Sequence, residues 1–408
     1  MLHETPVQSY EKQKFTGSRG TNQSGVRAHN ERLVLSLVRR HEGLAKADIA
    51  RNTGLSAQTV SVIMRALERD GLLVRGMPIK GRVGQPSVPM LLAPDGAFSI
   101  GLKIGRRSAD LALMDFVGTI RRQLHETYPY PMPEAILDFA TRGTSKLLPT
   151  LPASRRDRVA GIGIATPFEL WNWAEEVGAP REKMAAWRDF DLAEALRARV
   201  PFPVLSQNDA TAACGAELVF GRGAEHPEFV YFFIGSFVGG GVVLNGAVYA
   251  GRTGNAGALG SMPVPSPNGH PRQLIDHASL FVLENRLRAG GIDPSSLWLR
   301  PDDWAAFGEP LDQWIDQTAQ YLAHAIVACC SVIDFSAAII DGGFPANVRA
   351  RIVEATAKAM AGLNLQGIRP PAVCEGAVGA NARVIGAASL PIFARYLVDP
   401  NVLFTNGA

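Results

Sequence analysis

Apolar residues recur at helical spacing in three short stretches within residues 26–69. The members of each apolar stripe lie three or four positions apart: Leu33, Val34, Leu37 and Val38, then Ile49 and Ala50, then Val60, Ile63, Met64 and Leu67. Gly43 and Gly54 stand where the first two helices should end, and Ser56 can cap the third by accepting from an exposed backbone N–H. This spacing predicts three short helices around a small apolar core.

Two β-type runs follow these helices, LLVRG at 72–76 and SVPMLL at 87–92, and the loop between them carries Lys80 and Arg82. A hairpin attached to three helices is typical of a winged helix-turn-helix, whose third helix enters the major groove of DNA. Two alternatives stay open. A three-helix cluster can be a packing module, and Arg82 can be a solvated turn charge.

The candidate DNA contacts are polar and basic side chains that the predicted helices and wing leave away from the core. They are Lys46, Arg51, Ser56, Gln58, Thr59, Ser61, Arg65, Lys80 and Arg82. Short polar side chains at the start of the third helix can reach base edges. Arg82 is placed to enter a narrow minor groove, where A·T-rich tracts concentrate negative potential. The expected partner is therefore a double-stranded DNA operator with A·T-rich flanks.

From Ala97 onward the pattern changes to short strands that alternate with helices. Strands are predicted at 98–105, 108–115, 119–128, 158–165, 203–207, 229–236, 240–251 and 337–341, with 203–207 buried and 337–341 the last. Helices are predicted near 133–148, 191–200, 273–287 and 311–333, with two more after the last strand. This order predicts two similar α/β lobes with a cleft at the strand ends.

We therefore divide the chain into a flexible arm at 1–25, a DNA-binding domain at 26–94 and a two-lobed body at 95–408, with a cleft near 208–260. The 408 residues, 47% of them hydrophobic, can bury more than one core. The net charge of +3 is uneven, because 14 Lys and Arg against 7 Asp and Glu up to residue 92 give +7 and leave −4 for the rest. A basic amino-terminal end suits contacts with phosphates.

Other compositional features exclude whole classes of protein. No apolar run is long enough to span a bilayer, and the start lacks the apolar stretch of a secretory signal, so we expect a cytoplasmic, nucleoid-associated protein. The four cysteines are scattered and form no CxxC pair, which argues against both a disulfide framework and a zinc site.

Three segments of the body carry a family resemblance. They are QNDATAACGAELVFG at 207–221, IGSFVGGGVVLNGAVYAGRTGNAGALG at 234–260 and IIDGG at 339–343. In this order they resemble the ROK family of repressors and sugar kinases, and the segments GRVGQPSVPMLLAP and GANARVIGAASLPIFARYL resemble its regulator branch. The resemblance covers about residues 26–403. It implies an α/β fold in which a winged helix-turn-helix precedes a two-lobed, actin-like ATPase (ribonuclease H-like) body, with a sugar or sugar derivative bound between the lobes.

The chain departs from this family at the residues that handle phosphate. Family kinases begin the first strand with Asp and continue with GGT, whereas this chain has Lys103 in the Asp position and Arg106 and Arg107 in place of small residues. Phe237, in GSFVGGG, adds bulk where a backbone should approach phosphate closely. Asp209 matches the family's general base, but a base without an anchored phosphate donor transfers no phosphate. We therefore expect no catalytic residue, no cofactor and no phosphotransfer.

The candidate ligand contacts are Asn208, Asp209, Asn255 and Gly257, which match polar or close-approach positions of the family's sugar site. A helix N-cap is the alternative role for Asn208 or Asp209. Three sugar-binding anchors of the family are replaced, by Ala258, Ser261 and Ile275.

Aromatic and histidine side chains near the cleft are also ambiguous. Phe168, Trp171 and Trp173 can stack on a sugar or pack in the core. The family's zinc motif is replaced by a segment without cysteine, so His270 and His277 lack partners and we expect no metal.

The leading hypothesis is a transcriptional regulator, a repressor of carbohydrate-utilisation genes that responds to a sugar-like effector. It would bind a palindromic operator as a homodimer or a dimer of dimers, because paired subunits match paired half-sites. Two alternatives stay open: an active sugar kinase with an appended DNA-binding end, and a ligand-blind DNA-binding protein.

Overall fold

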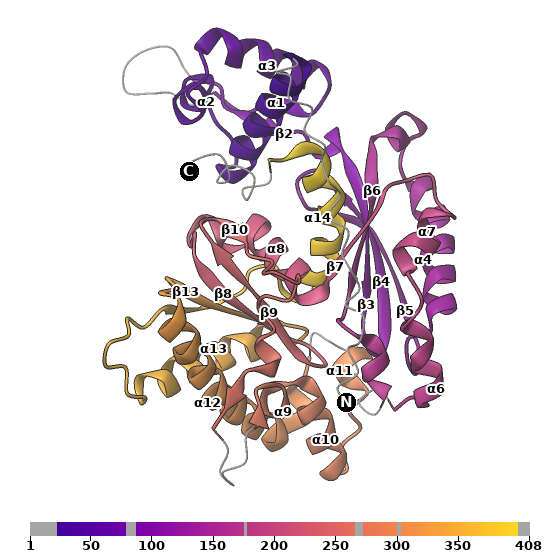
Figure 1. The fold of residues 1–408 in the computed structure, drawn as a ribbon, viewed down its shortest axis with the longest axis vertical. Coiled ribbons are helices and arrows are strands. Elements are labelled where there is room, and N and C mark those ends of the chain that lie inside the picture. Colours follow the sequence, from indigo (N-terminus) through magenta and orange to yellow (C-terminus); the bar gives the residue numbers. More distant parts are fainter. Residues whose placement is uncertain (1–22, 79–86, 175–177, 266–271, 300–302, 399–408) are drawn as a thin grey trace, which may run out of the picture.

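The computed structural model describes residues 23–78, 87–174, 178–265, 272–299 and 303–398, and all structural statements refer to these ranges. A small amino-terminal domain rests on one end of a body made of two α/β lobes (Figure 1). Within the described ranges, no helix combines the length and the apolar character that crossing a membrane requires.

The amino-terminal domain has the predicted winged helix-turn-helix layout. Its elements are α1 (Gln23–Arg40), α2 (Lys46–Thr53), α3 (Ala57–Arg69) and an antiparallel hairpin of β1 (Leu73–Arg75) and β2 (Met90–Leu92). Gly54 ends α2 in the left-handed conformation with φ 69°, and the Ser56 side chain caps α3 by accepting from the Thr59 N–H. Helix α1 begins inside the segment predicted as an arm, and Lys80 and Arg82 lie outside the described residues.

The first lobe is built on a five-stranded sheet in the order β5-β4-β3-β6-β7. Its strands are β3 (Phe98–Ile104), β4 (Ser108–Asp115), β5 (Ile120–Thr127), β6 (Val159–Thr166) and β7 (Val204–Asn208). Helices α4 (Pro133–Leu147), α6 (Arg181–Met184) and α7 (Leu192–Arg197) lie on one side of this sheet (Figure 1). The prediction that residues 203–207 form a buried strand is wrong, because β7 is an edge strand in which only Val204 is buried.

The second lobe repeats this topology with the order β10-β9-β8-β13-β14. Its strands are β8 (Phe229–Ile234), β9 (Val238–Leu244), β10 (Ala247–Val248), β13 (Ala337–Gly342) and β14 (Ala372–Glu375). In both sheets the first three strands of the lobe are antiparallel neighbours and the last two pair in parallel. The prediction of two similar lobes is therefore confirmed.

The second lobe differs from the predictions in one helix and in its last strand. They are α9 (Ile275–Ala278), α10 (Leu280–Ala289), α11 (Ser296–Leu299), α12 (Gly308–Val332) and α13 (Ala346–Ala361), beside the short strands β11 (Pro263–Val264) and β12 (Arg272–Gln273). The single helix predicted at 273–287 is interrupted at Ser279, whose ψ of 156° is extended. The strand predicted at 337–341 is not the last, because β14 follows it at the edge of the sheet.

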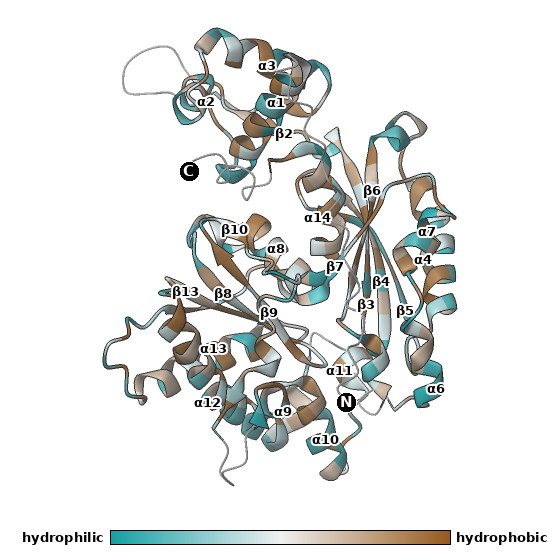
Figure 2. Cartoon of the chain, viewed as in Figure 1, coloured by the Kyte–Doolittle hydropathy of each residue, from teal (hydrophilic) through white to brown (hydrophobic). Residues whose placement is uncertain are grey.

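The hydrophobic cores lie on the central strands of each lobe. Every residue of β3, β8 and β13 is buried, and these strands are mostly brown in Figure 2. Such strands are covered on both faces, which is why their sequences read as nearly continuous apolar runs.

Two helices, α8 (Asp209–Phe220) and α14 (Ala382–Tyr396), pack against each other between the two sheets. Helix α14 packs closely on strand β6 and on helix α8, and both contacts depend on glycine residues. A Cβ atom on Gly163 of β6 would lie 1.8 Å from the Ala387 carbonyl oxygen of α14, and one on Gly386 of α14 would lie 2.0 Å from the Ala212 carbonyl oxygen of α8. Backbone therefore meets backbone at both contacts of α14.

The amino-terminal domain shares an apolar core with the body. One cluster of buried side chains joins residues of α1, α2, α3 and the wing to Met114, Phe116, Ile392 and Leu397 of the body. Arg39 is half-buried at this junction, where it donates to the Phe116 carbonyl and lies over the Phe116 and Phe220 rings. The far end of α14 is thus part of the core of the DNA-binding domain.

This shared core can be tested with Ile392→Ala. Because Ile392 is fully buried in the cluster, the truncation should lower the free energy of unfolding by about 2–5 kcal/mol and accelerate amide hydrogen exchange in α2 and α3. Val332→Ala is the matched control, because Val332 is 83% exposed. Exchange in α2 and α3 that is unchanged by Ile392→Ala, despite a destabilised body, would show that the two parts do not share a core.

Candidate functional site

A cavity of about 260 Å³ opens between the two lobes, where β3, β7 and β8 end. All four predicted ligand contacts, Asn208, Asp209, Asn255 and Gly257, line it. Residues 105 and 106 and the segment 167–168 line it from the first lobe, and residues 236–240 from the second. The structure therefore brings the predicted residues together, while their role as ligand contacts stays a prediction.

Asn208 and Asp209 are partly committed to contacts within the protein. The Asn208 Oδ1 atom caps α8 by accepting from the N–H groups of Ala210 and Thr211, both at 3.1 Å. The Asp209 carboxylate accepts from the Arg383 guanidinium at 3.2 Å, and both side chains are 16% exposed. Asn208 therefore caps α8 through its side-chain oxygen. The N–H groups of its side-chain amide stay available to a ligand.

Arg383 is a cleft residue that the sequence reasoning missed. It lies in the first turn of α14, lines the cavity and places its guanidinium 4.8 Å from the centre of the Phe233 ring. A periodic helix pattern marks only which residues are buried, so nothing in the local sequence indicates that this arginine pairs with Asp209, 174 residues away.

Lys103, in the position of the kinase family's metal-binding Asp, is paired within its own sheet. Its Nζ atom donates at 3.0 Å to Asp110, its partner in the β3–β4 ladder, and at 3.3 Å to Ser108, the first residue of β4. Burial lowers the pKa of the Lys103 ammonium, and the nearby Arg383 charge lowers it further. Although burial opposes it, the Lys103 charge and the His125 hydrogen bond hold the pKa of Asp110 at about 2.

Arg106 crosses from the first lobe to the second at the position of the family's phosphate loop. It donates to Glu284 of α10 at 2.5 Å, with the two side chains only 2% and 4% exposed, and lies 5.0 Å from the centre of the Phe281 ring. Phe237 also spans the lobes, because its ring packs edge-on against Trp173 with centroids 4.4 Å apart. A buried ion pair and an aromatic pair thus join the lobes across the cleft.

The glycines of the second phosphate-like segment have a packing role. They lie in strand β9, which forms an antiparallel hairpin with β8, and Gly239 and Gly240 also line the cavity. A Cβ atom on Gly239 would lie 2.6 Å from the Ala210 Cβ, and one on Gly241 would lie 2.5 Å from the Cys214 Cβ. Gly257, with φ 82°, lies against Gly241 in the same way. These glycines let α8 and the 251–257 loop approach the strand closely.

The residues that replace the family's sugar anchors, Ala258, Ser261 and Ile275, also line the cavity, as do Phe168 and Trp173. Trp171 instead packs against the core of the first lobe. His277 stacks on Tyr321 with ring centroids 3.8 Å apart, whereas His270 lies outside the described residues.

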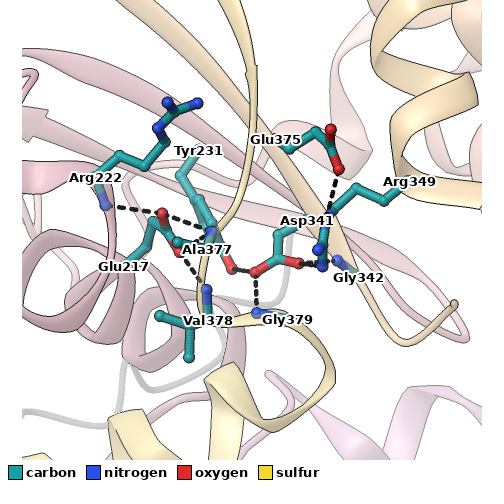
Figure 3. A network of polar contacts seen from close by, with 10 residues as sticks. All are labelled: Glu217, Arg222, Tyr231, Asp341, Gly342, Arg349, Glu375, Ala377, Val378 and Gly379. Carbon is teal, nitrogen blue, oxygen red and sulfur yellow. Dashed lines mark hydrogen bonds and ion pairs between the residues drawn. The ribbon is translucent and has the colours of Figure 1, made fainter. Parts of the chain in front are cut away.

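A buried carboxylate network anchors the loop before α14 to the second lobe (Figure 3). Glu217 of α8 accepts from the N–H groups of Arg222, Ala377 and Val378 at 3.0–3.1 Å. Asp341 at the end of β13 accepts from the Gly379 N–H at 2.9 Å.

Two side chains complete the network around Asp341 (Figure 3). The Tyr231 hydroxyl donates to it at 3.2 Å, and Arg349 donates to it at 3.3 Å. Burial raises the pKa of Asp341, and the N–H groups of Gly342 and Gly379 and the charge of Arg349 counteract this rise. The start of α14 is therefore held by charged groups of the second lobe.

The predicted DNA contacts lie mostly on the surface of the amino-terminal domain. Lys46, Arg51, Ser56, Gln58 and Arg65 are exposed, and Thr59 and Ser61 are half-buried. Helix α3 lies at the end of the molecule remote from the second lobe (Figure 1).

Local contacts qualify some of these predictions. Ser56 and Thr59 bond to each other in the cap of α3, and Arg51 pairs with Asp48 at 3.3 Å. Val62 of α3 is 54% exposed and is not among the predicted contacts, because those were chosen from polar and basic side chains. An exposed apolar side chain there can contact a thymine methyl group.

Comparison with known proteins agrees with this geometry. A family model described as "ROK family" matches residues 99–273, and one described as "Winged helix-turn-helix DNA-binding" matches residues 27–74. The chain is 25% identical to the uncharacterised protein y4fQ of Sinorhizobium fredii over 89% of this chain and 91% of that protein. It is 27% identical to the xylose repressor of Bacillus spizizenii over 60% of this chain, and the match spans 62% of that repressor's length.

Solved structures support the fold. A crystal structure described as a ROK family transcriptional regulator, homolog of the E. coli MLC protein, superposes with a TM-score of 0.63 at 20% identity, covering 91% of this chain and 97% of that one. A likeness at this identity concerns the fold. It extends over the winged helix and both lobes.

The capping role of Asn208 yields a prediction about stability without ligand. Asn208→Ala removes the acceptor for two N–H groups and should lower the free energy of unfolding by about 1 kcal/mol, measured by urea denaturation. Asn208→Ser should retain most of the stability, because serine caps helices comparably well. If the alanine and serine variants were equally stable, the cap would contribute nothing.

Proposed function

Since the chain belongs to the ROK family, with a winged helix-turn-helix ahead of the ROK domain, we propose that it is a sugar-responsive, DNA-binding transcriptional repressor. The observation that carries the proposal is the path of α14. One end of this helix places Arg383 in the interlobe cavity, and the other end, at Ile392 and Leu397, is buried in the core of the DNA-binding domain. A ligand in the cleft and the recognition helix are therefore linked by one rigid element.

The mechanism follows from the different attachments of α14. Its middle packs on the backbone of the first lobe through Gly163, whereas the loop before it is held by Glu217 and Asp341 of the second lobe. A ligand that prefers one lobe arrangement shifts the population of that arrangement and moves the DNA-binding domain with it.

A homodimer converts this small movement into a change in DNA affinity. Two recognition helices must reach half-sites one or more helical turns apart, so a shift in their separation weakens binding to a palindromic operator. The proposed setting is the cytoplasm, on the nucleoid, at carbohydrate-utilisation genes. Lys80 and Arg82 stay predicted wing contacts to A·T-rich flanks.

The body is proposed to recognise without catalysing phosphotransfer. The Arg106–Glu284 ion pair and the Phe237–Trp173 contact occupy the two loops that hold nucleotide phosphates in family kinases. Asp209, the counterpart of the kinase base, has its carboxylate on Arg383. The alternative, an active sugar kinase, would require these contacts to open and the site to gain a metal.

A DNA-binding experiment tests α3. Operator fragments recovered by genomic pull-down would be titrated against the protein by fluorescence anisotropy at several salt concentrations. Arg65→Ala should weaken binding to all of them and reduce the slope of log K against log salt by about one, as for the loss of one phosphate contact. Gln58→Ala should instead relax the preference at one base pair by about 1–3 kcal/mol.

The control for this experiment is Arg142→Ala, which removes an exposed charge from α4 in the first lobe. It should leave affinity and salt slope unchanged. If Arg65→Ala and Arg142→Ala had equal effects on DNA affinity and salt slope, α3 would not be part of the DNA interface.

A coupled ATP-turnover assay across a panel of sugars tests the absence of phosphotransfer. We expect no turnover above the background without protein. In the two loops that would hold nucleotide phosphates, Arg106 contacts Glu284 and Phe237 contacts Trp173 instead. Robust turnover that Asp209→Asn abolishes would establish the sugar kinase instead.

A further inference from the structure

Two arginines that line the cleft have guanidinium N–H groups without hydrogen-bond partners. Arg106 donates to Glu284 from one terminal nitrogen, while its Nε and Nη1 atoms have no partner among the described residues, although the side chain is only 2% exposed. Arg383 donates from Nη1 to Asp209, and its buried Nε atom is likewise without a partner. A buried donor left unpaired costs about 1–3 kcal/mol, so these groups favour any ligand that supplies acceptors.

The charges around the cleft do not balance. Glu284 is shared between Arg106 and Arg288, Asp209 is paired with Arg383, and Asp110 with Lys103. Arg288 is 49% exposed and lies outside the cavity lining. Among the described residues that line the cavity, Arg106 and Arg383 are positive and Asp209 is the one carboxylate. Burial lowers the pKa of Arg106, in keeping with a guanidinium that is poorly compensated.

The rest of the lining offers fewer carboxylate acceptors to a neutral sugar than the resemblance to family kinases implies. Ala258 and Ile275 stand where the resemblance to family kinases places glutamates, and Ser261 stands where it places a histidine. Losing two carboxylates from a sugar site makes it weaker for hydroxyl groups and more favourable for anions. Guanidinium groups bind carboxylate and phosphate through paired, charge-assisted hydrogen bonds.

We propose that the effector of this protein carries a carboxylate or phosphate group, which Arg106 and Arg383 bind in the interlobe cleft. This inference rests on the proposed function and names the chemical class of its ligand as a sugar acid or a sugar phosphate. The anion would compete with Glu284 for Arg106. Binding would therefore loosen the ion pair that joins the lobes, so recognition of the charge is itself the event that changes the lobe arrangement.

Matched sets of ligands test the proposal. Each set consists of a neutral sugar, its uronic or aldonic acid and its phosphate ester, for glucose, galactose, mannose and xylose, tested by thermal melting and then by calorimetry on the full chain. At least one acid or ester should bind at least tenfold more tightly than its neutral parent, with an affinity that falls as potassium chloride is raised. The acid and ester arms distinguish a carboxylate from a phosphate. The inference is overturned if the neutral sugars bind as tightly as their charged forms or if no anion in the panel binds.

Two variants separate ligand binding from lobe structure. Arg106→Gln should weaken binding of the anion found in the panel at least tenfold. Glu284→Gln breaks the same ion pair but frees the Arg106 guanidinium, so it should tighten anion binding. If both variants weakened binding alike, Arg106 would act only by holding the lobes together, and the proposal would be wrong.

Operator binding, measured on the same samples, keeps this inference distinct from the proposed function. Tight operator binding with no response to any charged ligand would refute the anionic effector alone. A protein that binds the anion but no genomic DNA fragment would refute the repressor and leave the cleft chemistry standing.

Discussion

The carbonyl oxygens of α14 lie against bare backbone in the first lobe, because Gly101 and Gly163 have no side chains there. A Cβ atom at these positions would lie 2.3 and 1.8 Å from carbonyl oxygens of the helix, far inside any tolerable contact. The helix therefore cannot slide or rotate on the sheet without losing close packing over its whole length. Whatever moves the first lobe also moves α14, and with it the DNA-binding domain whose core contains Ile392.

The opposite side of α14 has a different kind of attachment. Gly386 touches the backbone of α8, and the loop ahead of the helix donates N–H groups to Glu217 and Asp341 (Figure 3). Carboxylates buried with several donors are geometrically demanding, because breaking one contact leaves an uncompensated charge. Movement between the lobes must therefore be taken up where α8 meets α14. The proposed movement would therefore occur beside the Asp209–Arg383 pair, and so beside the proposed ligand site.

The sequence predicted most of the fold because local periodicity follows burial. The stripes of α1 to α3, the strands with continuous apolar runs and the Ser56 cap all appear where they were expected. The predictions were wrong where contacts with residues distant in the sequence determine the secondary structure or its burial. PVLSQ is apolar enough for a central strand but has a partner on one side only, and helical periodicity continues across the break at Ser279.

The candidate site was predictable in its location but not in its connections. The family-like segments placed Asn208, Asp209, Asn255 and Gly257 around one cavity. The Arg106–Glu284 and Asp209–Arg383 pairs join residues 178 and 174 positions apart, and no local pattern encodes such pairings. In the sequence, Arg106 and Arg107 indicate a loss of kinase chemistry. The ion pair that Arg106 forms with Glu284 across the lobes could be found only in the folded structure.

An ion pair is well suited to the junction of a switch because its net stabilisation is small. The Coulomb attraction between Arg106 and Glu284 is largely offset by the cost of removing both groups from water. A ligand can shift an equilibrium only by the difference in its affinity for the two states, and couplings of about 1–3 kcal/mol are typical. A junction held by a large apolar interface would exceed that range and stay closed. Across the cleft, at Arg106 and Phe237, the lobes are joined by a charge pair and an aromatic pair, and these contacts are within the reach of a small molecule that offers the arginine a better partner.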